Sequence, residues 1–74
     1  MKDTIIELLE SIKTGVDYAS CGALVDDGVL TSFEIMRLVS LLADEFDVEI
    51  TAAELIPENF NSVEAMQAMI EELQ

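Results

Sequence analysis

Residues 26–46 read DDGVLTSFEIMRLVSLLADEF, an acidic glycine turn followed by an amphipathic run. Thr31 and Glu34 have the S/T-x-x-E spacing of a capping box, in which a hydroxyl and a carboxylate satisfy the first free backbone N–H groups of a helix. The apolar residues that follow recur at helical spacing and would form one buried face: Ile35, Leu38, Val39, Leu42 and Phe46. The stretch therefore predicts a helix over residues 32–46, with Thr31 as its N-cap and Ser32 as its first residue.

Ser32 lies where the geometry of this helix is most tightly specified. Leu30 before the cap and Ile35 after it have the spacing of a hydrophobic staple, which fixes the direction in which the chain enters the helix. The free backbone donors and the positive end of the helix dipole favour a phosphate group at this place. The chain has no histidine to activate a hydroxyl. We therefore interpret Ser32 as an acceptor for an attached group rather than as a catalytic nucleophile.

Three other pairs have the same capping-box spacing, namely Thr4–Glu7, Thr51–Glu54 and Asn61–Glu64. The first predicts a helix that stops at Gly15, with Lys13 in its last turn to complement the dipole. The second predicts a helix of one or two turns before Pro57. The third predicts that the last helix starts at Asn61. The inward-facing residues of the first and last helices would be Ile5, Leu8, Leu9, Ile12 and Val16, and Val63, Met66, Ile70 and Leu73.

The fold class that follows is all-α. We expect a small antiparallel four-helix bundle with one short helix and a long loop between the first and second helices. A chain of 74 residues of which 51% are hydrophobic suits a single domain, residues 1–74. The long connection, residues 16–30, must either pack down on its own apolar residues, among them Tyr18 and Leu24, or carry function.

The charge balance restricts the possible partners. Three basic residues, Lys2, Lys13 and Arg37, oppose 16 acidic ones, which gives a formal net charge of -13. Three basic residues cannot neutralise the phosphates of a nucleic acid or of an anionic membrane surface, so the charge balance disfavours both as partners. Proteins with basic patches fit such a field, and solubility alone explains it equally well.

No residue cluster indicates a metal site or an active site. Asp26 and Asp27 precede Gly28, but the alternating oxygen ligands of a calcium loop are missing because Ala23 and Val25 occupy two of the positions. Without histidine and with few cations, catalysis by the chain alone is not expected, and the prediction is a non-enzyme. Cys21 is the single cysteine, which fits a small apolar loop residue in a reducing compartment.

The chain is also expected to be a soluble, cytoplasmic monomer. It shows no charged-then-apolar signal pattern and no apolar run of membrane-spanning length.

Two large apolar residues fall on the outer face of the second helix, one turn from Ser32. Phe33 and Met36 share that face with Arg37, Ser40 and Asp44. Either the long loop folds over them, or they form a ridge on which a partner docks. Their position beside Ser32 favours docking. Ser62 also follows a candidate cap, but it has no acidic loop before it and no apolar ridge after it.

The chain resembles the acyl carrier protein family. The residues that carry the resemblance are GVLTSFEI at 28–35, DEFDVEI at 44–50 and ENFNSVE at 58–64. The similarity extends over nearly the whole chain, and the Ser-Phe pair is also similar to D-alanyl and other aminoacyl carriers. The resemblance implies that Ser32 bears a covalent 4'-phosphopantetheine arm, attached by a phosphopantetheinyl transferase, whose terminal thiol holds acyl groups as thioesters.

The resemblance also implies a docking surface for synthases and acyl-transferring enzymes. By position it comprises Thr31, Phe33, Glu34, Met36, Arg37 and Ser40. An acyl chain would tuck between the second helix and later ones, in fatty-acid or related polyketide or aminoacyl biosynthesis.

Two departures from the family pattern matter. Thr31 stands where the family usually has Asp, which preserves the cap but removes a charge that a generic transferase would recognise beside the attachment point. Arg37 stands where fatty-acid carriers often have an acidic residue, and this reversed charge suggests specialised partners. The alternative function is an unmodified acidic helical adaptor that binds basic partner proteins.

Overall fold

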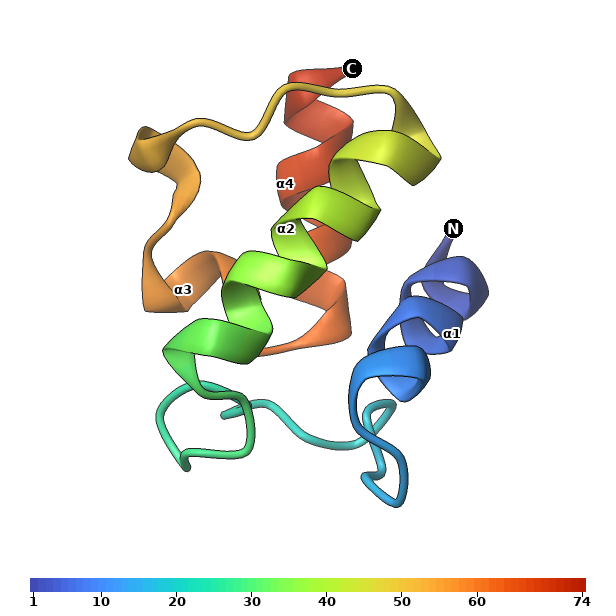
Figure 1. Ribbon diagram of the computed structural model, residues 1–74, viewed down its shortest axis with the longest axis vertical. Coiled ribbons are helices and arrows are strands. Elements are labelled where there is room, and N and C mark those ends of the chain that lie inside the picture. Colours follow the sequence, from blue (N-terminus) through green and yellow to red (C-terminus); the bar gives the residue numbers. More distant parts are fainter.

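The computed structural model describes all residues, 1–74, and contains helices and no strands. The elements in chain order are α1 (Lys2–Ile12), α2 (Ser32–Phe46), a 3-10 turn η1 (Ala52–Glu54), α3 (Pro57–Phe60) and α4 (Val63–Leu73). Figure 1 shows α1 running opposite to α2 and α4, with the long connection at the end of the molecule where α2 begins. The expected small antiparallel bundle is confirmed. No helix has the length and apolar composition that crossing a membrane would require.

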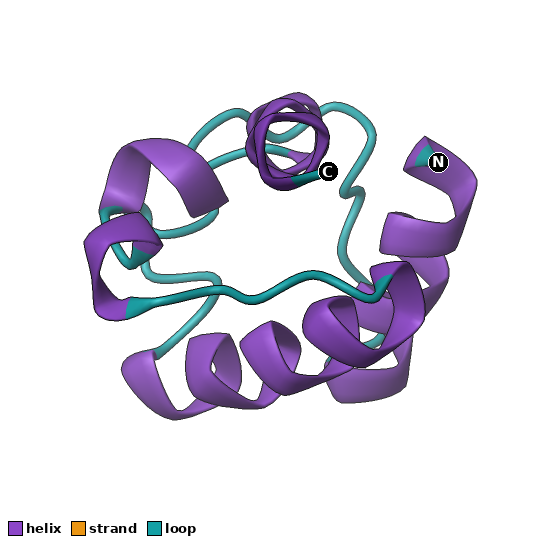
Figure 2. Ribbon diagram, turned by 90° about the horizontal axis from the view of Figure 1, so that it is seen from above, coloured by secondary structure: helices purple, strands orange, loops and turns teal.

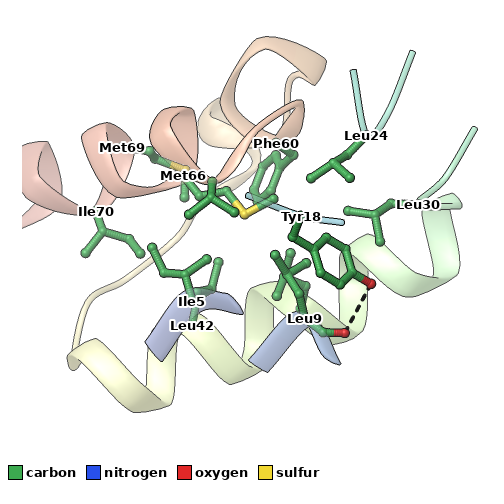
Figure 3. Close-up of a cluster of buried hydrophobic side chains, with 12 residues drawn as sticks. Ile5, Leu9, Tyr18, Leu24, Leu30, Leu42, Phe60, Met66, Met69 and Ile70 are labelled. Carbon is green, nitrogen blue, oxygen red and sulfur yellow. Dashed lines mark hydrogen bonds between the residues drawn. The ribbon is translucent and has the colours of Figure 1, made fainter. Parts of the chain in front are cut away.

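The core is made by 12 buried hydrophobic side chains that come from the helices and from the long connection. Helix α1 packs against α2 and α4, and α3 packs against α4. Viewed along α4 in Figure 2, the other helices surround this interior. Tyr18, Leu24 and Leu30 of the connection point into the same cluster (Figure 3). The connection is therefore packed down on its own apolar residues, as one of the two expectations had it, and Cys21 lies half-buried against the core.

The first helix differs from the prediction at both ends. It begins at Lys2, because the Met1 carbonyl accepts from the Ile5 N–H at 3.1 Å and extends the helix to the start of the chain. The predicted start at Thr4 is therefore wrong. The helix ends at Ile12, before Gly15. Lys13 lies just beyond the last turn, and its Nζ donates to the Val29 carbonyl at 2.9 Å instead of acting on the helix dipole.

In the second half of the chain, one of the two predicted capping boxes is present and the other is not. Thr51 N and Oγ1 both donate to Glu54 Oε1 at 2.7 Å, and the turn that they open is the 3-10 turn η1. A separate short helix, α3, which the sequence pattern did not predict, then begins at Pro57, whose fixed φ suits a first helical position.

The predicted Asn61 cap of the last helix is wrong. Ser62 is the N-cap of α4 and accepts from the Ala65 N–H at 3.0 Å.

Candidate functional site

The entry to α2 is built as the sequence predicts. Thr31 Oγ1 accepts from the Glu34 N–H at 3.4 Å, and the Thr31 N–H donates to Glu34 Oε1 at 2.9 Å, which completes the capping box. Leu30 is buried and Ile35 packs half-buried against the core, as a hydrophobic staple requires. Ser32 is the first residue of the helix and is exposed to solvent.

The loop before Ser32 is held in place by hydrogen bonds from three directions. Gly28 has a positive φ of 73°, which glycine adopts without strain, and its N–H donates to the Val25 carbonyl at 3.0 Å. Lys13 holds the Val29 carbonyl. The side-chain oxygen of Asn61 accepts from two consecutive loop N–H groups, those of Val25 and Asp26, each at 3.0 Å. Asn61 therefore anchors the loop instead of capping α4.

Ser32 and Ser62, the two serines at helix starts, differ in how their hydroxyl groups are used. The Ser62 hydroxyl is used as a cap and the residue is half-buried. The Ser32 hydroxyl, in contrast, has no hydrogen-bond partner within the chain and faces solvent. At this helix start the Glu34 N–H donates to Thr31 Oγ1 and the Ile35 N–H donates to the Thr31 carbonyl, whereas the N–H groups of Ser32 and Phe33 have no partner in the chain. An anionic group on Ser32 would thus find two free backbone donors.

The outer face of α2 is uncovered. Phe33 is 80% exposed and Met36 57% exposed, so the alternative in which the loop folds over them is wrong. Arg37 and Ser40 are also exposed. The structure has one ion pair, between Lys2 and Glu64 at 3.4 Å, so Arg37 stands on this face without a carboxylate partner despite the large excess of acid.

An apolar groove opens beside Ser32, between the start of α2 and the segment from η1 to α3. It has a volume of about 270 Å³, and its lining is Val25, Ser32, Ile35, Met36, Leu55, Ile56, Pro57 and Phe60. The sequence pattern did not predict the wall opposite α2, which is formed by Leu55, Ile56, Pro57 and Phe60. The exposed apolar pair Leu55 and Ile56, next to a proline and beyond any helical face, was the available signal. No group of three or more acidic or cysteine side chains is arranged to hold a metal ion.

Comparison with known proteins identifies the family. The chain is 38% identical over 63 residues to aminoacyl carrier protein 1 of Bradyrhizobium diazoefficiens, an alignment that covers 85% of this chain and 69% of that protein. The chain belongs to the acyl and aminoacyl carrier protein family. No family model matches the chain, and no solved structure matches it. Membership confirms the resemblance drawn from the residues around Ser32, while the role of each site residue stays a prediction.

Proposed function

We propose that this protein is a carrier whose Ser32 bears a covalent 4'-phosphopantetheine arm. The observation that supports this most directly is the Ser32 hydroxyl, which is exposed, unengaged and placed beside two free backbone donors at a helix start. The chain would act as a substrate for a phosphopantetheinyl transferase and then for acyl-transferring enzymes or synthases. It would have no catalytic residue of its own, and it would work as a single domain over residues 1–74, as a cytoplasmic monomer.

The residues present fit such an arm. The phosphodiester would lie at the positive end of the α2 dipole, with the N–H groups of Ser32 and Phe33 in reach. The arm, once attached, supplies a thiol that carries acyl groups as thioesters. The groove beside Ser32 is lined mainly by apolar side chains, so it would shelter the apolar part of an acyl cargo from water.

The proposed docking surface is the outer face at the start of α2. It comprises Thr31, Phe33, Glu34, Met36, Arg37 and Ser40. Phe33 and Met36 would fill an apolar pocket of the partner, and the acidic surroundings would attract basic residues around that pocket. Arg37 would require a carboxylate of the partner, which gives the surface a charge pattern that excludes uniformly basic partners.

The biosynthetic context is fatty-acid synthesis or a related polyketide or aminoacyl route. The name of the Bradyrhizobium relative indicates aminoacyl cargo in that protein. In this chain the apolar groove favours acyl cargo, because an α-ammonium group would lose its hydration there without gaining a partner.

Intact mass spectrometry tests the proposal. Wild-type protein incubated with coenzyme A and a phosphopantetheinyl transferase of broad specificity should gain the mass of one arm. Ser32→Ala should gain none. Ser62→Ala is the matched control, because it removes the other serine at a helix start, and it should be modified like the wild type. A wild-type chain without mass gain, or a gain that persists in Ser32→Ala, contradicts the proposal, and the first result would favour the adaptor function.

A further inference from the structure

The ammonium group of Lys13 binds the loop that leads into Ser32. Its Nζ donates to the Val29 carbonyl at 2.9 Å, and both residues are half-buried. The end of α1 and the start of α2 lie at the same end of the molecule (Figure 1). This hydrogen bond therefore joins the end of the first helix to the entry of the second.

A backbone carbonyl is an unexpected partner for a lysine in so acidic a chain. Three basic residues face 16 acidic ones, and Coulomb attraction favours pairing with a carboxylate, as Lys2 pairs with Glu64 at 3.4 Å. Lys13 forms no ion pair and donates to a neutral oxygen instead. A charged donor makes a stronger hydrogen bond than a neutral one. The contact therefore restrains the backbone of the loop.

The backbone of Lys13 is itself fixed by the core. Its N–H donates to the Leu9 carbonyl at 2.9 Å, and its carbonyl accepts from the Tyr18 hydroxyl. Leu9 and Tyr18 are both buried. The lysine side chain thus extends from a rigid base, and its hydrogen bond to Val29 ties the loop to that base.

The loop of residues 24–30 is held from outside at two places. The Leu30 N–H donates to the Leu24 carbonyl at 2.8 Å and closes the loop. The side chain of Asn61 holds its first half, and Lys13 holds its second half. Without Lys13, the hydrogen bonds that remain in the second half are those within the loop.

We propose that Lys13 is a positioning residue for the attachment of the arm to Ser32, because it holds the preceding loop in the conformation that the phosphopantetheinyl transferase binds. The proposal rests on the proposed function. An enzyme that reaches the Ser32 hydroxyl also meets Asp27 and Gly28, the exposed loop residues shortly before it. A loop that is already ordered adds no ordering cost to binding. Lys13 acts through the Val29 backbone and does not touch the reacting atoms.

Two variants separate positioning from charge. Lys13→Met keeps an apolar stem and removes the ammonium donor. Lys2→Met removes an equal charge at the other end of α1, where the lysine contacts Glu64 and not the loop. Each substitution makes the chain more negative, which by itself would speed association with a basic enzyme. Loss of positioning predicts the opposite effect, and only for Lys13→Met.

Steady-state kinetics of arm transfer measure this difference, with a transferase of broad specificity, saturating coenzyme A and varied carrier concentration. Lys13→Met should raise the KM for the carrier about fivefold and keep kcat near the wild-type value, because the ordering cost falls on binding and not on the transfer step. Lys2→Met should keep the wild-type KM or lower it slightly. Lys13→Arg retains a charged donor and should stay close to wild type.

Amide hydrogen exchange locates the effect without the enzyme. In Lys13→Met the N–H groups of Gly28 and Leu30, in the second half of the loop, should exchange faster than in wild type. Those of Val25 and Asp26 have their own anchor and should exchange at the wild-type rate. Thermal unfolding verifies that each variant is folded at the assay temperature.

Three results would refute the positioning role. The first is a KM of Lys13→Met that does not exceed that of Lys2→Met, even if the melting temperature falls, because a lysine that serves stability alone gives this result. The second is a Lys13→Arg variant as impaired as Lys13→Met, and the third is unchanged exchange in the second half of the loop. A wild-type chain that accepts no arm contradicts the proposed function instead.

Discussion

The Tyr18 hydroxyl does for the end of α1 what Thr31 does for the start of α2. It donates to the Lys13 carbonyl at 2.5 Å, and it lies 3.4 Å from the Leu9 carbonyl (Figure 3). Carbonyl groups in the last turn of a helix have no partner within the helix, and in a buried place they need one. The Tyr18 ring is 1% exposed, so a single side chain both fills the core and closes the helix end.

Replacing Tyr18 by Phe should therefore destabilise the fold while leaving its shape unchanged. We expect a loss of about 1–3 kcal/mol in the free energy of unfolding, the usual cost of leaving a buried polar group without its partner. Urea denaturation followed by circular dichroism measures this value. An equal stability of wild type and Tyr18→Phe would show that the hydroxyl contributes nothing at the end of α1.

The same pair of proteins should differ in their response to alkaline pH. Burial raises the pKa of Tyr18 above its ordinary value, and the negative charges of Glu34 and Glu10 add to the shift. A raised pKa in the folded chain means that the stabilisation is complete below the unfolded pKa of about 10 and is lost as the pH rises through the folded pKa. Wild type should thus lose stability above about pH 10 faster than Tyr18→Phe. Parallel stability curves in urea would contradict this.

At the scale of elements, the sequence predicts what is encoded locally. The bounds of α2, Ser32–Phe46, follow from a cap, a staple and an apolar face that all lie within one short stretch. The predicted start of α1 was wrong because this helix begins at Lys2 without any side-chain cap, and its first backbone hydrogen bond runs from the Ile5 N–H to the Met1 carbonyl. The helix α3 was missed because its four residues are too few to show a period.

Contacts between segments that are far apart in the sequence could not be predicted from local sequence patterns. Nothing near Asn61 indicates that its side chain serves a loop more than thirty positions earlier in the chain. The resemblance placed an acyl chain between the second helix and later ones, but the lining of the groove was not predicted for the same reason, since Val25 and the start of α2 form one part of it and the segment Leu55–Phe60 forms the other. The exposure of Ser32 and the free backbone donors beside it were predictable, because both follow from its place in a locally encoded cap.

The Asn61 anchor predicts a selective loosening of the loop before Ser32. Asn61→Ala removes the acceptor of the Val25 and Asp26 N–H groups, so we expect a loss of about 1–3 kcal/mol in stability and faster amide exchange at these two residues. Asp26→Ala is the control, because it removes only the exposed bond to Asn61 Nδ2. It should cost about 0.5 kcal/mol or less. Hydrogen exchange that is unchanged in Asn61→Ala would contradict the anchoring role.

At the scale of the whole molecule, repulsion between acidic side chains opposes the stabilisation that the hydrophobic core provides. The formal net charge is -13, and the single ion pair, between exposed Lys2 and Glu64, contributes little. The 12 buried side chains of the core must hold together carboxylates that are forced closer by folding than in the unfolded chain. Stability should therefore depend on how strongly the solution screens these charges.

Raising the ionic strength with NaCl from about 0.01 M to about 0.3 M should raise the melting temperature, because the screening length falls from about 30 Å to well below 10 Å. A gain of about 1 kcal/mol corresponds to about 4–8 °C for a domain of this size. Melting curves followed by circular dichroism measure the shift, and KCl should give the same result. CaCl2 at matched ionic strength separates screening from binding, since a clearly larger shift would reveal a calcium site among the carboxylates. A melting temperature that falls with NaCl would mean that attractive charge pairs outweigh the repulsion.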